Sequence, residues 1–372
     1  MNKKPHFTVI GAGHGGKAMA AHLSLMDFPV TLYNRTEEHI SVIQALGGIE
    51  LINYDDLPHG FAKLEKATSN IAEAVEGADV IMVVTPSTAH AQLAEKMAPY
   101  LTAGQIVVLN PGRTLGALEV NRIFRGRGVD PGVVVAEAET LIYASRSEGP
   151  ALARIFRMKE SVPLAALPAS CTSQVLDVIN QAYPQFFNGI SVLHTGLNNM
   201  GAIFHPALTL LNAGRIESTR GEFQFYIDGV TPSVAKVLEV LDRERVTVAA
   251  ALGIRARTAI EWLKMAYDAS GTDLHDAIHN QPGYYGIQAP STLNHRYITE
   301  DIPMSLVPIA ALGERYGVSV RGMDSIIRLA CVIHSTDYWR RGRTPDKLGM
   351  DRWSVTELTR YVMEGGEELF DN

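Results

Sequence analysis

The chain has 372 residues, of which 46% are hydrophobic and 20% are charged. This balance is typical of a globular protein with a substantial core and excludes a largely disordered chain. The net charge is -7 and there is no basic block, which argues against nucleic acid as the main partner. No apolar run reaches the roughly 18 residues of a membrane span, so no membrane partner is expected.

The two cysteines and the first residues bear on the cellular compartment. Met1 to His6 run directly into an apolar stretch, without the apolar core and cleavage site of a signal peptide. Cys171 and Cys331 lie far apart, which excludes a disulfide framework and a zinc knuckle. We therefore expect a cytoplasmic protein.

A glycine-rich turn follows the first predicted strand. Phe7 to Ile10 is a short β-branched run, and Lys17 to Met26 has helical composition. In the G-x-G-x-x-G pattern between them, Gly11 allows a tight turn, Gly13 lets a pyrophosphate approach the backbone, and Gly16 lets the helix pack on the strand. The pattern predicts dinucleotide binding, and the candidate cofactor-binding residues here are Gly11, Gly13, His14, Gly15 and Gly16.

The end of the second predicted strand, Pro29 to Tyr33, bears on the choice of nucleotide. An acidic residue at this point would bind the ribose hydroxyls and repel a 2′-phosphate. This chain has Asn34, Arg35 and Thr36 instead, and an arginine can pair with a phosphate and stack on adenine. We therefore favour NADP over NAD; alternatively, Arg35 is a solvated turn residue and Asn34 accepts NAD.

Strands and helices then alternate along the chain. The expected elements are a helix near Glu37 to Leu46, a hairpin-like excursion from Ile49 to Leu64, a strand from Asp79 to Val84, a helix from Ala89 to Tyr100 and a strand from Ile106 to Leu109. Such alternation predicts a doubly wound parallel sheet of the Rossmann type, with ligands bound outside the carboxyl ends of its strands. Thr85, Pro86, Asn110 and Gly112 follow two of these strands and are further candidates for cofactor contacts.

The remainder of this domain is expected to extend the sheet. Val133 to Glu139 reads as a strand, as do Ala153 to Met158 and Val162 to Leu167, with an antiparallel extension as one arrangement. A helix from Ser173 to Gln181 closes the domain, and Phe186-Phe187-Asn188-Gly189 breaks the pattern. We predict a Rossmann domain over residues 1–190 and an all-α domain over residues 191–372.

Helical periodicity dominates the second half. Thr231-Pro232 is a helix start, and apolar residues then repeat at helical spacing until Gly253. Further helices are predicted for Ile254 to Asp268, Pro303 to Tyr316 and Met323 to Trp339. A loop from Asn280 to Asp301 lies between the first and the second of these three helices. A loop of about 20 residues in a compact domain usually has a function.

One histidine occurs in an apolar, helix-compatible segment, Asn198 to Gly214. Pro206 removes a backbone donor and disfavours the α conformation of the residue before it, so we expect a helix to start or kink there. His205 would then lie at this break, where the positive end of a helix favours the neutral ring needed for acid/base chemistry. The alternative is a core histidine satisfied by a neighbour.

Other chemistry has less support in the sequence. His275 and His279 stand four residues apart, as zinc ligands can, but they lack a metalloprotease motif and an evident third ligand, so we expect no metal site. Neither a serine elbow nor a cysteine in a reactive context is present. At the end of the long loop, Arg296, Glu300 and Asp301 are either a solvated charged turn or part of a site.

Taken together, these patterns resemble the octopine/nopaline (opine) dehydrogenase family over nearly the whole chain. The resemblance rests on Gly11 to Gly16, Asn110 to Glu119, Phe204 to Ala207, Leu211 to Gly214, Phe225 to Pro232, Asp242 to Arg245 and Arg296 to Pro303. It implies a Rossmann domain followed by a helical domain. It also implies an enzyme that condenses an α-keto acid with an amino acid and reduces the resulting imine with NADPH or NADH.

Site residues follow from the same resemblance. His205 would be the acid/base group, Asp301 the carboxylate that orients it, and Arg296 a cation for a substrate carboxylate. Thr140, Ser145 and Asn199 would be further substrate neighbours. Ser145 stands where well-known members have a cysteine, which argues against arginine as the substrate. The sequence does not name the substrate pair and leaves a homodimer open.

Two other functions remain open at this point. A Rossmann reductase resembling ketopantoate reductase or glycerol-3-phosphate dehydrogenase would use a catalytic lysine, and no lysine stands in a matching helical context. A non-catalytic NADP-sensing protein would not need His205 and Asp301 to be coupled.

Overall fold

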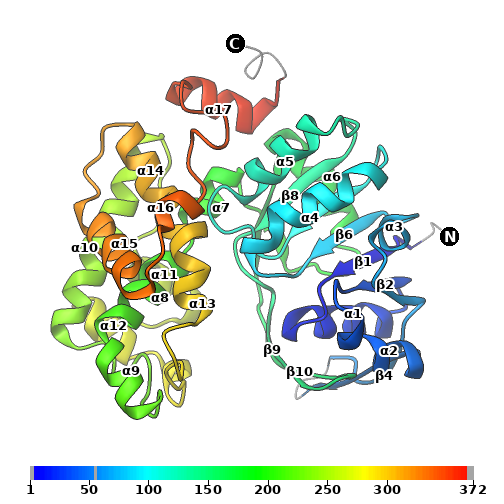
Figure 1. The fold of residues 1–372 in the computed structure, drawn as a ribbon, viewed down its shortest axis with the longest axis horizontal. Helices are drawn as coiled ribbons and strands as arrows, with labels where there is room; N and C mark the ends of the chain where they lie inside the picture. Colours follow the sequence, from blue (N-terminus) through cyan, green and yellow to red (C-terminus); the bar gives the residue numbers. More distant parts are fainter. Residues whose placement is uncertain (1–3, 54–56, 367–372) are drawn as a thin grey trace. The chain divides into compact units, whose positions relative to one another are not determined.

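A computed structural model describes residues 4–53 and 57–366 (Figure 1). The chain divides into two compact units, Met1–Thr195 with Arg360–Asn372, and Gly196–Thr359. The sequence-based limit lay between residues 190 and 191 and assigned the C-terminal end to the helical domain. The structure instead groups the end of helix α17 (Val355–Glu364) with the first unit, in which Asn121 donates a hydrogen bond to the Tyr361 hydroxyl (2.7 Å).

The first unit is built on an eight-stranded sheet with the order β12-β11-β8-β7-β6-β1-β2-β5. All neighbouring strands are parallel except β8 and β11, which are antiparallel. The strands are β1 Phe7–Ile10, β2 Val30–Tyr33, β5 Lys66–Thr68, β6 Val80–Val83, β7 Ile106–Leu109, β8 Val134–Ala138, β11 Val162–Leu167 and β12 Phe186–Asn188. This is the doubly wound Rossmann sheet predicted from the sequence.

Helices alternate with these strands. They are α1 His14–Leu25, α2 Ser41–Leu46, α3 Ile71–Val75, α4 His90–Met97, α5 Gly116–Gly126 and α6 Thr172–Ile179. Short 3-10 turns cover Glu37–His39, Ser87–Ala89, Ala98–Tyr100 and Ala169–Cys171. The central strands are buried on both faces, as parallel strands between two helical layers must be.

A second, four-stranded sheet has the order β4-β3-β10-β9. Its strands are β3 Gly48–Asn53, β4 Gly60–Lys63, β9 Tyr143–Gly149 and β10 Leu152–Met158. β3 and β4 are antiparallel, in agreement with the hairpin-like excursion, although residues 54–56 of that excursion lie outside the described residues.

Two predictions for the end of this domain were wrong. β11 is the antiparallel extension that the sequence left open, but β10 lies outside the main sheet and pairs with β3 and β9. Phe186–Asn188 does not break the pattern but forms β12, which pairs with β11 and buries Phe186.

The second unit is helical, as predicted, with one isolated bridge between Gln224 and Gln288. Its helices are α8 Gly201–Leu211, α9 Ala213–Thr219, α10 Pro232–Ala251, α11 Ala259–Tyr267, α12 Leu274–His279, α13 Arg296–Thr299, α14 Val307–Arg315, α15 Arg321–His334 and α16 Tyr338–Arg341. Helix α7 (Val192–Leu197) spans the division between the units, Pro282–Tyr284 is a 3-10 turn and Ile302–Leu306 is a π-helical turn.

The long helix α10 organises the second unit. It starts as predicted, with the Thr231 hydroxyl accepting a hydrogen bond from the Val234 amide (3.3 Å), and it packs against α8, α12, α14 and α15. The single helix expected from Met323 to Trp339 is instead two, because Ser335 adopts a left-handed conformation (φ 46°) that ends α15.

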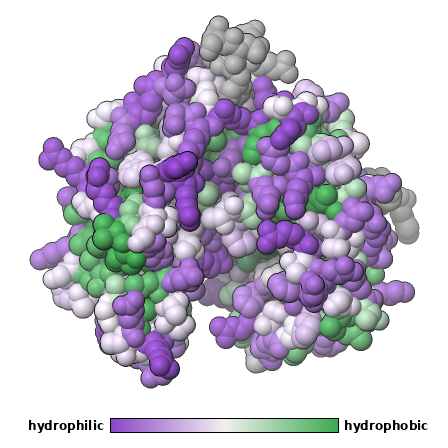
Figure 2. All heavy atoms as spheres, viewed as in Figure 1, coloured by the Kyte–Doolittle hydropathy of each residue, from purple (hydrophilic) through white to green (hydrophobic). Residues whose placement is uncertain are grey.

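The surface offers no sign of a membrane-spanning segment. Among the described residues, no helix combines the length and the apolar character that crossing a bilayer would require. The visible face is mostly polar, and hydrophobic residues gather over α15 (Figure 2), where Leu329, Val332 and Ile333 are exposed.

A buried polar chain in the first unit links α1 to the strands. The His22 ring nitrogen Nδ1 lies 2.7 Å from the Tyr143 hydroxyl, which donates to the Tyr183 hydroxyl at 2.8 Å. Burial lowers the pKa of His22 from 6.5 to about 4, so the folded chain holds this ring neutral.

We expect the folded state to lose stability as the pH falls below 6.5. The unfolded chain binds a proton on His22 near pH 6.5 and the folded chain only near pH 4, so the free energy of unfolding should drop by about 2 kcal/mol from pH 7 to pH 5 through this residue. Urea unfolding of the wild type and of His22→Gln at both pH values measures the difference. Equal pH dependence in the two proteins would contradict this assignment.

Candidate active site

Helix α8 carries His205 inside its span. The helix runs from Gly201 to Leu211 and includes Pro206, so the alternative that a helix starts at that proline was wrong. Proline removes a single backbone bond, and this helix is buried along most of its length, which outweighs the loss. The Thr209 hydroxyl donates to the His205 carbonyl (2.7 Å), the acceptor that stands one turn before it.

His205 pairs with Asp301, which is 96 residues away in sequence. The ring nitrogen Nδ1 lies 2.8 Å from the carboxylate oxygen Oδ2. Asp301 is 0% exposed and the His205 side chain 19% exposed. An ionised carboxylate only accepts hydrogen bonds, so Nδ1 carries a proton and the neutral ring has its lone pair on Nε2. A ring held in this way can take up a proton at Nε2 and release it again.

Tyr297 stacks on the face of the His205 imidazole. The sequence analysis did not identify this residue. Its ring stacks on His205 with centroids 4.1 Å apart and 20° between the planes, and Phe225 stacks on Tyr297 in turn at 5.3 Å. The available signal was spacing, because Tyr297 stands four residues before Asp301, and residues so spaced share one side of a helical turn.

His295 is a second residue that the sequence did not single out. Its ring lies edge-on to Tyr297, with centroids 4.4 Å apart. Burial, followed by the charges of Arg296 and His205, lowers the pKa of His295. The neighbourhood of His205 therefore contains a second imidazole that stays neutral more readily than a solvated one.

Arg296 begins α13 and forms an ion pair rather than a solvated turn. Its Nη2 lies 2.9 Å from Oε2 of Glu300, whose side chain is 3% exposed, whereas that of Arg296 is 52% exposed. A guanidinium has five N–H donors, so one carboxylate partner leaves donors on its exposed side.

Asn199 and the π-helical turn secure the segment around the pair. The Asn199 amide donates to the Ser305 hydroxyl (2.9 Å), and both side chains are buried. Ser305 lies on the turn Ile302–Leu306, which directly follows Asp301. Asn199 is therefore held by the turn that follows the buried carboxylate.

A buried ion pair on α10 supports the chain before His205. Arg245 is 0% exposed and donates to Asp242 and to the backbone carbonyls of Leu197 and Arg257. Asp242 accepts from the Ala259 amide (2.7 Å). These bonds join the end of α7 and the start of α11 to α10, just before the segment that carries Asn199 and His205.

The glycine turn of the first unit fits a dinucleotide. Gly11 has φ 111°, and a side-chain carbon on Gly16 would lie 1.7 Å from the Gly11 carbonyl oxygen, so the turn and the helix approach require glycine at both positions. A carbon on Gly13 would meet nothing within 4 Å, which leaves open space beside the backbone at the start of α1. Gly15 packs against Leu141. A phosphate group is well stabilised at such a helix start.

The residues after β2 divide into an inward and an outward group. The Asn34 side-chain oxygen Oδ1 accepts a hydrogen bond from the Ala12 backbone amide (3.2 Å), and its side-chain Nδ2 donates to the Thr36 backbone carbonyl (2.9 Å), so Asn34 holds the glycine turn in place. Arg35 is exposed and donates to Gln92 at 3.3 Å. A cation thus occupies the position where NAD-specific enzymes present a carboxylate.

The carboxyl ends of β6 and β7 carry polar groups, as expected. Within the described residues, neither the buried Thr85 hydroxyl nor the Asn110 side-chain oxygen has a hydrogen-bond partner. Pro86 is exposed beside Thr85. A side-chain carbon on Gly112 would lie 2.3 Å from the buried Glu137 carboxylate. Polar atoms of this kind at a strand end suit contacts with a bound nucleotide.

Three other sequence-predicted residues belong to the first unit. The Thr140 hydroxyl accepts from Nζ of Lys159 (2.7 Å). The Ser145 hydroxyl donates to the His14 carbonyl (3.3 Å), and the His14 ring accepts from the Ser147 amide (2.9 Å). His14 is therefore bonded to β9. Arg296 and Asn199 belong to the second unit.

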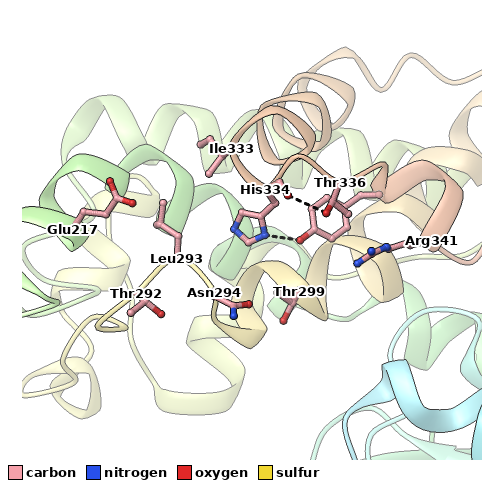
Figure 3. A pocket seen from close by; sticks show the side chains of 10 residues that line it. Glu217, Thr292, Leu293, Asn294, Thr299, Ile333, His334, Thr336 and Arg341 are labelled. Carbon is pink, nitrogen blue, oxygen red and sulfur yellow. Dashed lines mark hydrogen bonds between the residues drawn. The ribbon is translucent and has the colours of Figure 1, made fainter.

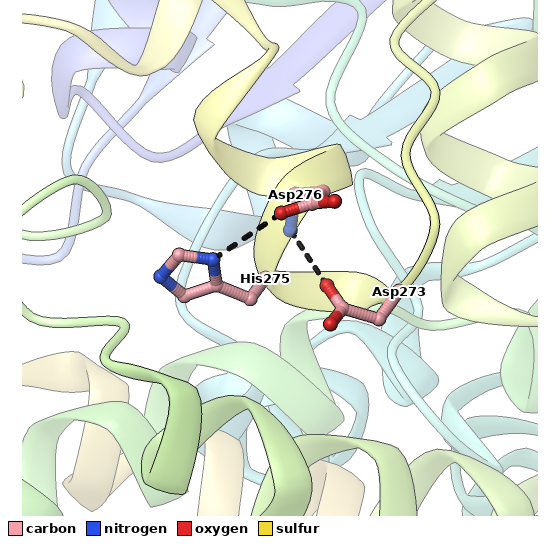
Figure 4. Close-up of side chains that lie close together, drawn as sticks. All are labelled: Asp273, His275 and Asp276. Atoms are coloured by element: carbon pink, nitrogen blue, oxygen red, sulfur yellow. Dashed lines mark hydrogen bonds and ion pairs between the residues drawn. The ribbon is translucent and has the colours of Figure 1, made fainter.

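The histidines considered for zinc have other partners. The rings of His275 and His279 stack at 4.1 Å, and both nitrogens of His279 lie near backbone carbonyls, 2.8 Å from that of His275 and 2.9 Å from that of Ile227. Asp273, His275 and Asp276 also lie close together (Figure 4), with Asp273 accepting from the Asp276 amide as the cap of α12. Helix capping accounts for Asp273, and His275 Nδ1 lies 3.6 Å from Asp276 Oδ1.

A pocket of about 490 Å³ lies in the second unit, between α13 and the α15–α16 region (Figure 3). His334 bonds the Tyr338 hydroxyl there (2.7 Å), and Arg341 lies at its edge. Thr299 lines this pocket, whereas Tyr297, two residues earlier on α13, stacks on His205. Residues two apart on a helix point in nearly opposite directions, so the pocket and His205 contact different faces of α13.

Comparisons with known proteins agree with this arrangement. The family model described as NAD/NADP octopine/nopaline dehydrogenase, alpha-helical domain, matches residues 189–334. The one described as NAD-dependent glycerol-3-phosphate dehydrogenase N-terminus matches residues 6–111. The second match is confined to the nucleotide-binding half, which many dehydrogenases share.

Full-length similarity extends to solved structures. An octopine dehydrogenase in complex with NADH and agmatine has a TM-score of 0.81 at 20% identity and covers 96% of this chain and 98% of that chain. A yersinopine dehydrogenase with NADP+ bound has a TM-score of 0.76 at 14% identity, covering 97% and 99%. At these identities the similarity shows a common fold.

Sequence identity to a named relative is decisive for the family. The opine dehydrogenase of Arthrobacter sp. (strain 1C) is 38% identical over 356 residues, covering 96% of this chain and 98% of the relative. The chain therefore belongs to the NAD/NADP-dependent octopine/nopaline (opine) dehydrogenase family.

Proposed function

We propose that this enzyme condenses an α-keto acid with the amine of an amino acid and reduces the product to a secondary amine. The observation that carries the proposal is the 2.8 Å contact between His205 Nδ1 and the fully buried Asp301 carboxylate. Membership of the opine dehydrogenase family supports the reaction class. When bound, the nicotinamide supplies the hydride that reduces the imine carbon.

His205 would carry the protons of the condensation. The neutral amine nitrogen loses one proton after it attacks the keto carbon, and the carbonyl oxygen gains two before it leaves as water. One further proton therefore comes from solvent, and the species that the hydride reduces is the protonated imine. Nε2 of His205 can accept and return these protons in turn. Asp301 holds the tautomer and stabilises the imidazolium, as a buried carboxylate does for other catalytic histidines.

Arg296 is the proposed cation for a substrate carboxylate. The exposed donors of Arg296 would bind a substrate carboxylate while Glu300 holds the guanidinium in position. Thr140, Ser145 and Asn199 would complete the binding of the two substrates. The cofactor would lie on the glycine turn and along the carboxyl ends of β6 and β7, where Thr85 and Asn110 have polar atoms without described partners.

A preference for NADP is part of the proposal. Arg35 is exposed at the end of β2, and the Asn34 side chain is bonded to the glycine turn. Neither side chain is negatively charged, so neither repels a 2′-phosphate. A guanidinium can bind that phosphate and stack on the adenine.

The purified enzyme should oxidise NADPH only when an α-keto acid and an amino acid are both present. Loss of nicotinamide absorbance in a matrix of keto acids against amino acids measures this and identifies the pair. Equal oxidation with a keto acid alone would show that the enzyme reduces a carbonyl and would overturn the condensation.

His205→Ala should abolish turnover and leave NADPH binding intact. Asp301→Asn should lower kcat by about 10²–10⁴, because the amide no longer holds the productive tautomer. Asp324→Asn, a partly exposed acid in an ion pair with Arg328, is the matched control and should keep full activity. Near-normal kcat in Asp301→Asn, with unfolding temperature unchanged, would exclude the proposed pair.

Arg35→Ala should reduce the preference for NADPH over NADH by about tenfold or more, since a charge-assisted contact with the 2′-phosphate is lost. The ratio of kcat/KM for the two nucleotides measures the effect. Arg127→Ala removes another exposed arginine of the first unit and should leave the ratio unchanged. An unaltered ratio in Arg35→Ala would remove this residue from nucleotide selection.

A further inference from the structure

Lys159 lies between β10 and β11 with its ammonium in a defined position. Nζ donates to the Thr140 hydroxyl oxygen at 2.7 Å and to the Leu141 carbonyl at 2.9 Å. An ammonium has three donors and no acceptor, so two of its protons are committed and one remains. The lysine thereby determines the hydrogen-bonding role of its neighbour.

That neighbour, Thr140, is committed to donate its own proton elsewhere. Because its oxygen accepts from Lys159, the hydroxyl proton must point away from the ammonium. No residue in the described part of the chain accepts that proton. Thr140 and Lys159 therefore each present one donor, and they present these donors side by side.

The surroundings of this pair favour a negative charge. Burial lowers the pKa of Lys159 to about 8; the carboxylate of Glu139 opposes the shift, and the guanidinium groups of Arg113 and Arg157 add to it. At pH 7 the lysine is therefore mostly charged, and three cations stand against one anion. Thr140 follows β8 at the carboxyl edge of the sheet, where ligands of such folds bind.

We propose that Lys159 and Thr140 bind the α-carboxylate of the amino-acid substrate, and that Lys159 thereby determines specificity for amino acids over simple amines. This inference rests on the proposed function. One carboxylate oxygen accepts from the Thr140 hydroxyl and the other from the third Nζ proton.

A purely structural Lys159 would behave differently. Its bond to the Leu141 carbonyl connects the chain after β8 to the turn before β11. Loss of that bond would destabilise the fold and lower kcat/KM for all substrates alike. A carboxylate-binding Lys159 affects only substrates that carry the carboxylate. The two roles separate when the same enzyme is offered an amino acid and its decarboxylated amine.

The experiment compares three such pairs with pyruvate and NADPH: L-phenylalanine and 2-phenylethylamine, L-methionine and 3-methylthiopropylamine, and L-arginine and agmatine. The measured quantity is kcat/KM for the amino acid divided by that for the amine. In Lys159→Met and Thr140→Val this ratio should fall at least about tenfold, the effect of losing a hydrogen bond to a charged group. The KM for pyruvate should stay within about twofold.

Matched variants and a second readout keep the test sharp. Thr140→Ser retains the hydroxyl and should retain the ratio, and Lys159→Arg retains the charge and should retain more of it than Lys159→Met. If Lys159→Met does not fold, as judged by thermal unfolding, the comparison of Thr140→Val with Thr140→Ser decides.

Four outcomes would overturn the inference. Equal losses with amino acid and amine would assign Lys159 a structural role, and a raised KM for pyruvate would assign the pair to the keto acid. No wild-type turnover with any keto acid and amine would overturn the proposed function and this inference together. Turnover with an unchanged ratio in every variant would overturn this inference alone.

Discussion

The buried carboxylate of Asp301 imposes the constraint on which the second unit depends. A charge with no solvent exposure is tolerated only when donors surround it, and the donor identified on α8 is His205 Nδ1. The π-helical turn after Asp301 and the Asn199–Ser305 bond keep the neighbouring backbone in position. The same geometry that compensates the buried charge also holds the imidazole in one tautomer, so stability and proposed catalysis share one contact.

The first unit depends on a close approach between the backbone of the glycine turn and the start of helix α1. Helix α1 starts within contact distance of the Gly11 carbonyl, and the Asn34 side chain ties the end of β2 to the Ala12 amide. These contacts orient the start of α1 toward the open space beside Gly13. The Lys159–Thr140 pair stands at the carboxyl edge of the same sheet and adds positive charge there. Nucleotide binding and the proposed carboxylate recognition thus use one edge of one sheet.

Predictions from sequence patterns were correct where short-range backbone preferences were not opposed by tertiary packing. The alternation of strands and helices, the glycine turn and the Thr231-Pro232 helix start follow from short-range sterics and hydrogen bonding, and each is present in the structure. Local rules failed where tertiary burial outweighed them. Pro206 lies inside α8 because the helix is buried, and Phe186–Asn188 pairs as β12 because a neighbouring strand edge was available.

Sequence patterns alone predicted a Rossmann domain followed by helices, the opine dehydrogenase resemblance, and the residue types needed for acid/base chemistry. The folded chain was needed to show which distant groups meet: Asp301 with His205, Tyr297 stacked on the ring, and Lys159 bonded to Thr140. The two kinds of interaction differ in the distance along the chain over which they act. Backbone preferences act over a few residues and can be read in order, whereas these contacts join segments up to 96 residues apart and depend on how whole helices and strands pack.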